Sequence, residues 1–276
     1  HKAILRYIGF RKELHTGTLT EYLRKRGFGI QISTFCTVPY GSGLGSSSIL
    51  AAALLTVLYR LFNREISSQK RLNAVIGIEQ TLSYGGGWQD LLGGVTGGIK
   101  YIQSKAGLNP QPVLLQLNST FLKERIDSGF FTLYYTGVNR QTTAVTADVS
   151  RQMSKNIPSY IFTLRYLKVL AAEARSAIET SDLGALAEIM NLSQAENQKI
   201  MPVVADPYLD SLHQSVKGLF SGFKFSGAGG GGFALFVSES EQKAESLRDA
   251  LIKNSRQSGK IVPFSLNSSG LTVRVI

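Results

Sequence analysis

Apolar positions along the chain gather into segments of two different periods, separated by glycine-rich stretches. Residues 29–38 alternate apolar and polar positions and are rich in β-branched side chains, which predicts a buried strand. Three serines at positions 46–48 then precede a strongly apolar stretch, so a helix is expected from residue 49 to about residue 62. A second helix is expected over residues 67–82, because its apolar side chains fit one helical face.

The second half of the chain alternates between strand and helix patterns. Residues 130–135 predict a strand, and a long, mostly helical region follows, with breaks at Pro158 and near residues 181–182. Further strands are expected at residues 223–225, 233–237, 261–266 and 271–275, with a helix over residues 239–253. This strand–helix–strand order indicates an α+β domain. We place a domain boundary near Asp127, which gives domains 1–127 and 128–276.

Composition and charge narrow the class of protein. A hydrophobic fraction of 43% and a charged fraction of 18% are typical of a globular chain with a sizeable core. The net charge of +11 suggests an anionic partner, such as nucleic acid, phosphorylated metabolites or an acidic membrane. The basic residues are scattered, however, and the densest cluster, residues 24–26, is expected at a solvated helix end. A nucleic-acid-binding domain would also leave the glycine loops without a role.

Location is predicted from three further features. The longest apolar run, residues 49–59, is too short to cross a bilayer, and no signal peptide opens the sequence. The single cysteine, Cys36, favours a reducing compartment and is expected as a small core residue. We therefore expect a cytoplasmic protein with neither a membrane nor a nucleic acid as partner.

The strongest chemical signal is the loop Gly41-Ser42-Gly43-Leu44-Gly45-Ser46-Ser47-Ser48. Its glycines permit sharp turns and close backbone approach to a ligand. The helix that follows offers unpaired N–H groups and a partial positive charge, which together bind anions. A plain glycine-rich turn with a serine cap is the structural alternative. A Walker loop is excluded because no lysine is present, and a dinucleotide fingerprint lacks its third glycine at Ser46.

Two more glycine-rich stretches accompany this loop. The run Ser226-Gly227-Ala228-Gly229-Gly230-Gly231-Gly232-Phe233 holds more glycines than a turn between strands needs, so it is expected to approach a ligand closely. The stretch Gly85-Gly86-Gly87-Trp88-Gln89-Asp90 places a carboxylate beside a glycine loop. Together with Glu79, near the end of the preceding helix, Asp90 provides oxygen ligands of the kind that Mg²⁺ prefers beside substrate phosphates.

In this order and at this separation, the motifs resemble those of the GHMP kinases. The second family motif resembles Pro39 to Ser48, and the third resembles residues 227–231. The segment from Gly86 to Asp90, and Tyr135-Thr136-Gly137 with Arg140, are similar to fucokinases in particular. The resemblance implies a two-domain α+β fold, with a ribosomal-S5-like N-terminal domain and a ferredoxin-like C-terminal domain. It also implies transfer of the γ-phosphate of ATP to L-fucose, giving L-fucose 1-phosphate, with ATP and Mg²⁺ as cofactors.

The resemblance also implies a role for each motif. Residues 41–48 bind the ATP phosphates, and Ser47 and Glu79 hold Mg²⁺. Asp90 lies beside the acceptor hydroxyl, as a base or as a group that orients it and stabilises the transition state. The residues expected at the substrate are Gly86, Gly87, Trp88, Arg140, Gly227, Ala228, Gly229 and Gly230.

The sequence departs from the family pattern in two places. The N-terminal Pro-Gly-Arg motif is not found in residues 1–29, so we expect an N-terminal domain truncated at its start, and Leu91 stands where fucokinases usually carry Gln. In some organisms fucokinase is fused to a GDP-fucose pyrophosphorylase, so the resemblance also allows a larger chain with a nucleotidyltransferase domain. Alternatives are a heptose-phosphate kinase, another sugar kinase of the superfamily, or a non-catalytic nucleotide- or sugar-binding pseudokinase.

Overall fold

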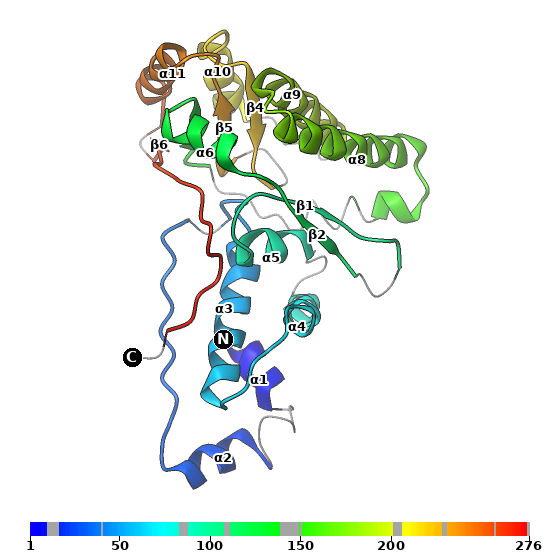
Figure 1. Ribbon diagram of the computed structural model, residues 1–276, viewed down its shortest axis with the longest axis vertical. Helices are drawn as coiled ribbons and strands as arrows, with labels where there is room; N and C mark the ends of the chain where they lie inside the picture. Colours follow the sequence, from blue (N-terminus) through cyan, green and yellow to red (C-terminus); the bar gives the residue numbers. More distant parts are fainter. Residues whose placement is uncertain are drawn as a thin grey trace.

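The computed structural model describes residues 1–9, 17–39, 41–82, 88–107, 111–138, 149, 151–200, 206–227, 231–256 and 258–274. The chain forms two parts, one above the other in Figure 1, with helices α1 to α5 below and a four-stranded sheet with its helices above. Both termini lie in the lower part, because the end of the chain returns to it from the sheet.

The lower part is built on two central helices. Helices α3 (Ser46–Leu61) and α4 (Ser68–Leu82) confirm the two helices predicted from the apolar pattern. They share one apolar core with α1 (Lys2–Gly9) and α5 (Trp88–Val95). Gly94 allows α5 to lie close to α3, since a Cβ there would stand 2.3 Å from the side chain of Ile49. The antiparallel hairpin of β1 (Lys100–Gln103) and β2 (Val113–Gln116) follows α5.

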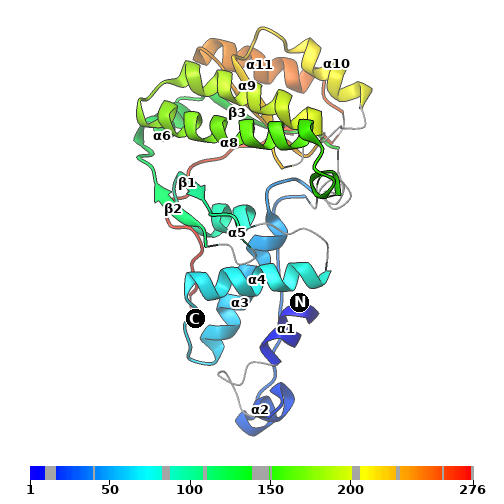
Figure 2. The ribbon, with the colours of Figure 1, turned by 90° about the vertical axis from the view of Figure 1, so that its right-hand side faces the viewer.

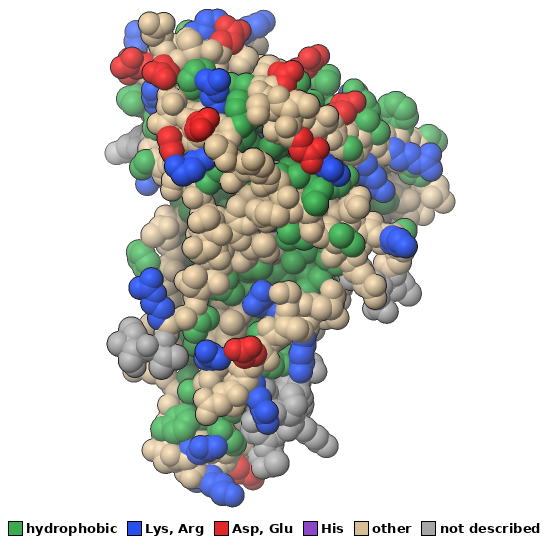
Figure 3. Space-filling model, viewed as in Figure 1, with side chains coloured by type: hydrophobic (Ala, Val, Ile, Leu, Met, Phe, Trp, Pro, Cys, Tyr) green, Lys and Arg blue, Asp and Glu red, His purple; other side chains and the backbone are tan. Residues whose placement is uncertain are grey.

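The basic cluster at residues 24–26 lies where it was predicted. Helix α2 (Leu19–Arg26) begins with a capping box between Thr18 and Glu21 and ends at Gly27, whose φ of 72° closes the helix. The three basic side chains occupy its last turn, where they complement the helix dipole. They are exposed, which confirms the solvated helix end. On the face shown in Figure 3, Lys and Arg side chains are spread out and form no single patch.

The buried strand predicted for residues 29–38 is wrong in its pairing and its burial. The segment is extended but belongs to no strand of a sheet, and Ile30 and Ile32 pack against the core from one side only. Phe35 is 89% exposed, and Cys36 is exposed where a core position was expected. The alternation specified an extended backbone, but no described strand lies beside this segment to bury its other side.

The sheet of the upper part has the strand order β4-β5-β3-β6, and every pairing is antiparallel. Its strands are β3 (Phe131–Tyr135), β4 (Gly222–Phe225), β5 (Phe233–Val237) and β6 (Lys260–Ile261). Helix α11 (Glu241–Lys253) connects β5 to β6. This order and connection confirm the predicted ferredoxin-like arrangement.

The end of the chain differs from the two strands predicted there. Residues 260–261 pair with β3, and Val262 N donates to Leu133 O at 2.9 Å, but described residues 262–274 form no strand. The segment instead returns to the lower part, where Leu271 N donates to Val95 O at 2.9 Å and Gly98 N donates to Asn267 O at 2.7 Å. These bonds join the C-terminal segment to the end of α5.

Helices cover both faces of the sheet. Helices α10 (Pro207–Ser215) and α11 pack through Leu212 and Leu247 against Tyr134 and Phe236. On the other face lie α6 (Thr120–Asp127), α8 (Pro158–Glu179) and α9 (Leu183–Ile200). Figure 2 shows α8 and α9 side by side in front of the sheet. The domain boundary near Asp127 stays a prediction.

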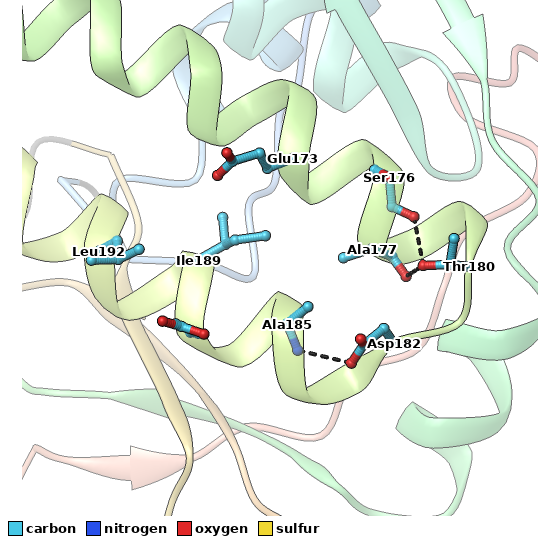
Figure 4. Close-up of a pocket in the computed structure, with 9 residues that line it drawn as sticks. Glu173, Ser176, Ala177, Thr180, Asp182, Ala185, Ile189 and Leu192 are labelled. Carbon is cyan, nitrogen blue, oxygen red and sulfur yellow. Dashed lines mark hydrogen bonds between the residues drawn. The ribbon is translucent and has the colours of Figure 1, made fainter.

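The bounds of α8 and α9 confirm the two predicted breaks in the helical region. Pro158 opens α8, and Asp182 accepts a hydrogen bond from Ala185 N at 2.9 Å at the start of α9. A surface groove of about 440 Å³ lies between the two helices (Figure 4). The Thr180 hydroxyl in this groove is already bonded to the backbone of α8, and none of the predicted site residues lines the groove.

None of the described helices is both long and apolar enough to cross a membrane.

Candidate active site

The predicted anion loop runs directly into the N-terminus of α3. Gly41, Gly43 and Gly45 have φ values of 73°, 77° and 64°, in the left-handed region that glycine adopts without strain. Gly45 is also the N-cap of α3, so no side chain caps the first turn. The first-turn N–H groups have no carbonyl partner within the helix. The loop therefore combines these donors with the positive end of the helix dipole.

The two long glycine loops pack against each other, backbone to backbone. A Cβ on Gly43 would lie 2.8 Å from Ser226 O, and one on Gly232 would lie 2.4 Å from Ser42 O. Phe233 N donates to Ser42 O at 3.3 Å, which ties β5 to the anion loop. Sequence reasoning expected these glycines to approach a ligand. At Gly43, Gly227 and Gly232 the neighbouring group is the backbone of the other loop.

The segment after β3 supports the second glycine loop. Thr136 bonds to Gly232 O through both its hydroxyl, at 3.0 Å, and its N–H, at 2.9 Å. Gly232 N donates in turn to Val138 O at 2.8 Å. The segment after β3, the second glycine loop and, through Phe233 and Ser42, the anion loop are therefore joined by hydrogen bonds. Thr136 is a supporting residue to which the sequence analysis gave no role.

The carboxylate of Glu79 lies buried between α3 and α4. Its Oε1 accepts a hydrogen bond from the Ser48 hydroxyl at 2.6 Å, and both residues are almost fully buried. The sequence analysis paired Glu79 with Ser47, the preceding residue, whose side chain is exposed at the start of α3. Ser47 as a metal ligand stays a prediction.

Asp90 lies against the anion loop. It occupies the first turn of α5, and a Cβ on Gly45 would stand 2.8 Å from the Cβ of Asp90. The absence of a side chain at Gly45 is thus what lets α5 bring this carboxylate to the start of α3. The structure brings Asp90, the anion loop and Glu79 together, as the sequence predicts.

The environment of both carboxyl groups disfavours their ionised forms, and Glu79 is affected by Asp90 as well as by burial. Burial raises the pKa of Glu79, the hydrogen bond from Ser48 lowers it, and the negative charge of Asp90 raises it again. Neighbouring protein atoms also raise the pKa of the Asp90 carboxyl by partial burial, although the residue as a whole is exposed to solvent.

This charge arrangement fits a divalent cation. A cation beside Glu79 and Asp90 would stabilise both ionised forms. No group of three or more His, Cys, Asp or Glu side chains with metal-binding geometry occurs in the described part of the chain. The donors present suit Mg²⁺, which is commonly held by one or two carboxylates and completed by substrate phosphates and water.

Several predicted residues have another place in the structure or lie outside the description. Trp88 opens α5 and is partly buried against the apolar core, so its predicted stacking on a sugar stays a prediction. The predicted residues outside the described ranges are Gly86, Gly87, Arg140, Ala228, Gly229 and Gly230.

Lys100 has a structural role that the sequence analysis did not assign. Its Nζ donates to Gly93 O at 2.9 Å and to Thr96 O, and so binds the last carbonyls of α5. A lysine two positions after Gly98, close behind the end of a helix, was the available signal.

Comparison with known proteins supports the same arrangement. The family model for the GHMP kinase N-terminal domain matches residues 13–98, and the model for the C-terminal domain matches residues 174–257. A structure of Lactococcus lactis galactokinase complexed with galactose superposes with a TM-score of 0.65 at 17% identity, over 91% of this chain and 73% of that one.

Three curated relatives align over most of this chain. The L-fucokinase/L-fucose-1-P guanylyltransferase of Bacteroides fragilis is 28% identical over 99% of this chain and 29% of its own length. The bifunctional fucokinase/GDP-fucose pyrophosphorylase of Arabidopsis thaliana is 32% identical over 86% of this chain and 23% of its own. A D-glycero-alpha-D-manno-heptose 7-phosphate kinase of Campylobacter jejuni is 24% identical over 90% and 71%. The chain thus spans less than a third of the two bifunctional relatives.

Proposed function

Because this chain belongs to the GHMP kinase family, we propose that it transfers the γ-phosphate of ATP to a hydroxyl of L-fucose, yielding L-fucose 1-phosphate and ADP. The observation that carries the proposal is the convergence of three groups at the start of α3. These are the glycine anion loop, the buried Glu79 and the carboxylate of Asp90. Phosphoryl transfer needs mainly positioning and charge neutralisation, which such an arrangement supplies.

Some residues at this site bind the phosphates of ATP, and another binds the acceptor hydroxyl. Backbone N–H groups of the loop and of the first turn of α3 bind the phosphates. Ser47 and Glu79 would hold Mg²⁺, which when bound neutralises charge on the phosphates. Asp90 orients the acceptor hydroxyl and accepts its proton as the oxygen bonds to phosphorus, while ADP leaves. Burial raises the pKa of the Asp90 carboxyl above its ordinary value, which makes it a stronger proton acceptor than a solvated aspartate.

The choice of L-fucose rests on the two relatives named as fucokinases and on the segment from Trp88 to Asp90, which resembles that family. A heptose phosphate is the second candidate, because the Campylobacter relative aligns over most of its own length. Leu91, where fucokinases usually carry Gln, is 1% exposed and packs in the apolar core. By analogy with the bifunctional relatives, a nucleotidyltransferase domain in the same polypeptide is part of this proposal.

The test is sugar-dependent release of ADP with Mg·ATP and a panel of L-fucose, D-arabinose, galactose and heptose 7-phosphate. Asp90→Asn is expected to lower turnover about 10²–10⁴-fold, the usual contribution of a general base. Asp249→Asn, a change of the same chemistry on the exposed face of α11, should retain the unsubstituted rate. Turnover with a heptose phosphate alone would replace L-fucose as the acceptor. ATP binding without turnover of any sugar would favour a pseudokinase.

A further inference from the structure

We propose that Ser48 is a positioning residue for the metal, because its hydroxyl fixes the Glu79 carboxylate in the orientation that a divalent cation requires. The inference rests on the proposed function, since it assumes that Glu79 holds Mg²⁺ beside bound ATP. It assigns different tasks to two adjacent serines. The exposed Ser47 is the direct ligand of the proposed function, and the buried Ser48 acts through Glu79.

The hydrogen bond between Ser48 and Glu79 has the properties of a strong, fixed contact. The oxygens are 2.6 Å apart, within the range of charge-assisted O–H···O⁻ bonds. Ser48 is 5% exposed and Glu79 is 8% exposed, so water does not compete freely for either group. The bond also joins α3 to α4, the two helices that must keep a constant separation for the site to bind a cation.

Serines within helices usually have a different bonding pattern. A hydroxyl in a helix commonly donates back to a carbonyl of its own helix. Thr56, also on α3, does so, with its Oγ1 bonded to Ala52 O at 2.7 Å. Ser48 instead donates to a carboxylate on another helix, and no side-chain cap is present at the start of α3. Its hydroxyl therefore serves Glu79 and not the local backbone.

The helix geometry explains why one serine cannot perform both tasks. Successive residues of a helix point about 100° apart, since there are 3.6 residues per turn. Ser47 is consequently exposed at the start of α3 while Ser48 is buried towards α4. A hydroxyl at position 48 reaches the carboxylate from the protein side, and the hydroxyl at position 47 is left for the ligand side.

Groups that donate a hydrogen bond to a metal-ligating side chain commonly strengthen metal binding. Removing such a partner typically weakens metal binding or activity about 10–100-fold, because the ligand loses its orientation. For Glu79 the loss is expected in the same range. ATP binding without metal should change little, because the Ser48 hydroxyl is engaged with Glu79.

The experiment measures binding of a fluorescent ATP analogue to the full chain, in EDTA and across a Mg²⁺ titration. The variants are Ser48→Ala, Glu79→Gln and the double variant, with Thr56→Val as a control that removes a hydroxyl from the same helix. Ser48→Ala is expected to raise the Mg²⁺ concentration at half-effect about 10–100-fold. Thr56→Val should stay within about twofold of the unsubstituted chain. Adding Ser48→Ala to Glu79→Gln should cause no further loss, since both act through one group.

Two results would overturn the inference while leaving the proposed function intact. One is a Mg²⁺ titration of Ser48→Ala that coincides with that of the unsubstituted chain. The other is an equal loss of nucleotide binding with and without Mg²⁺, which would indicate damage to the anion loop. If the unsubstituted chain itself gains nothing from Mg²⁺, the proposed function fails and the inference with it. If Ser48→Ala does not fold, Ser48→Cys, of similar size but a weaker donor, should show the same shift on a smaller scale.

Discussion

Substituting Gly45 by alanine tests the contact that brings Asp90 to the anion loop. Gly45 has a φ of 64°, a conformation that costs a residue with a side chain about 1–2 kcal/mol. The added Cβ would also lie 2.8 Å from the Cβ and 3.2 Å from the Cγ of Asp90. Backbone strain and steric overlap therefore act at the same residue.

The size of the expected effect follows from these distances. Carbon atoms in contact prefer a separation of about 3.5–4.0 Å, so Asp90 and the loop must move apart by about 0.7–1.2 Å from the 2.8 Å that the backbone dictates. A displacement of about 1 Å at a reacting group can cost about 100-fold in rate. We therefore expect kcat/KM to fall about 100-fold, or about 2.7 kcal/mol in the barrier. The free energy of unfolding should fall by at least the 1–2 kcal/mol of backbone strain.

The assay compares steady-state ADP release and urea unfolding for Gly45→Ala and a matched variant, Gly77→Ala. Gly77 lies exposed in α4, does not have a positive φ, and has no atom within 4 Å of an added Cβ. Alanine there should stabilise the helix by about 0.5–1 kcal/mol and leave turnover unchanged. If Gly45→Ala kept the turnover and stability of the unsubstituted chain, the close packing of Asp90 on the loop would be refuted.

Three further predictions concern charge, helix termination and exposure. Because burial raises the pKa of both Glu79 and Asp90, the folded chain binds their protons more tightly than the unfolded chain does. The two protonated carboxyl groups favour the folded state below the ordinary carboxylate pKa, and this contribution to the free energy of unfolding is lost as the pH rises through their raised pKa values. Asp90→Asn should therefore raise the melting temperature of the ligand-free protein near pH 8 and change it little near pH 4, and an unchanged difference between the two pH values would contradict the burial argument. Lys100→Met removes the bonds to Gly93 O and Thr96 O and should lower the free energy of unfolding by about 1–3 kcal/mol in urea titrations; a loss below about 0.5 kcal/mol would show that these bonds are replaced by water. Cys36, the single thiol, should react fully with a thiol reagent under native conditions, whereas a reaction that needs denaturant would restore the predicted core position.

The sequence alone determined the local elements of this protein. Pro158 and the strand pattern at residues 233–237 each specify a backbone conformation through nearby residues, and the structure has α8 beginning at Pro158 and β5 at residues 233–237. The apolar run after residue 48 is helical as predicted, but α3 already begins at Ser46, and its N-cap is Gly45 and not a serine. The glycine loops were recognisable for the same reason, since their backbone conformations exclude most other residues.

Tertiary structure decided which of these elements meet, and the sequence pattern does not carry that information. Alternating residues at positions 29–38 specify an extended backbone, but burial depends on a neighbouring strand, so Phe35 and Cys36 are exposed. Gly43 and Gly232 also lie against the backbone of the other loop, a contact that the sequence pattern did not predict. The choice of Ser48 over Ser47 as the partner of Glu79 depends on how α3 is rotated against α4, which is set by packing of the whole apolar core.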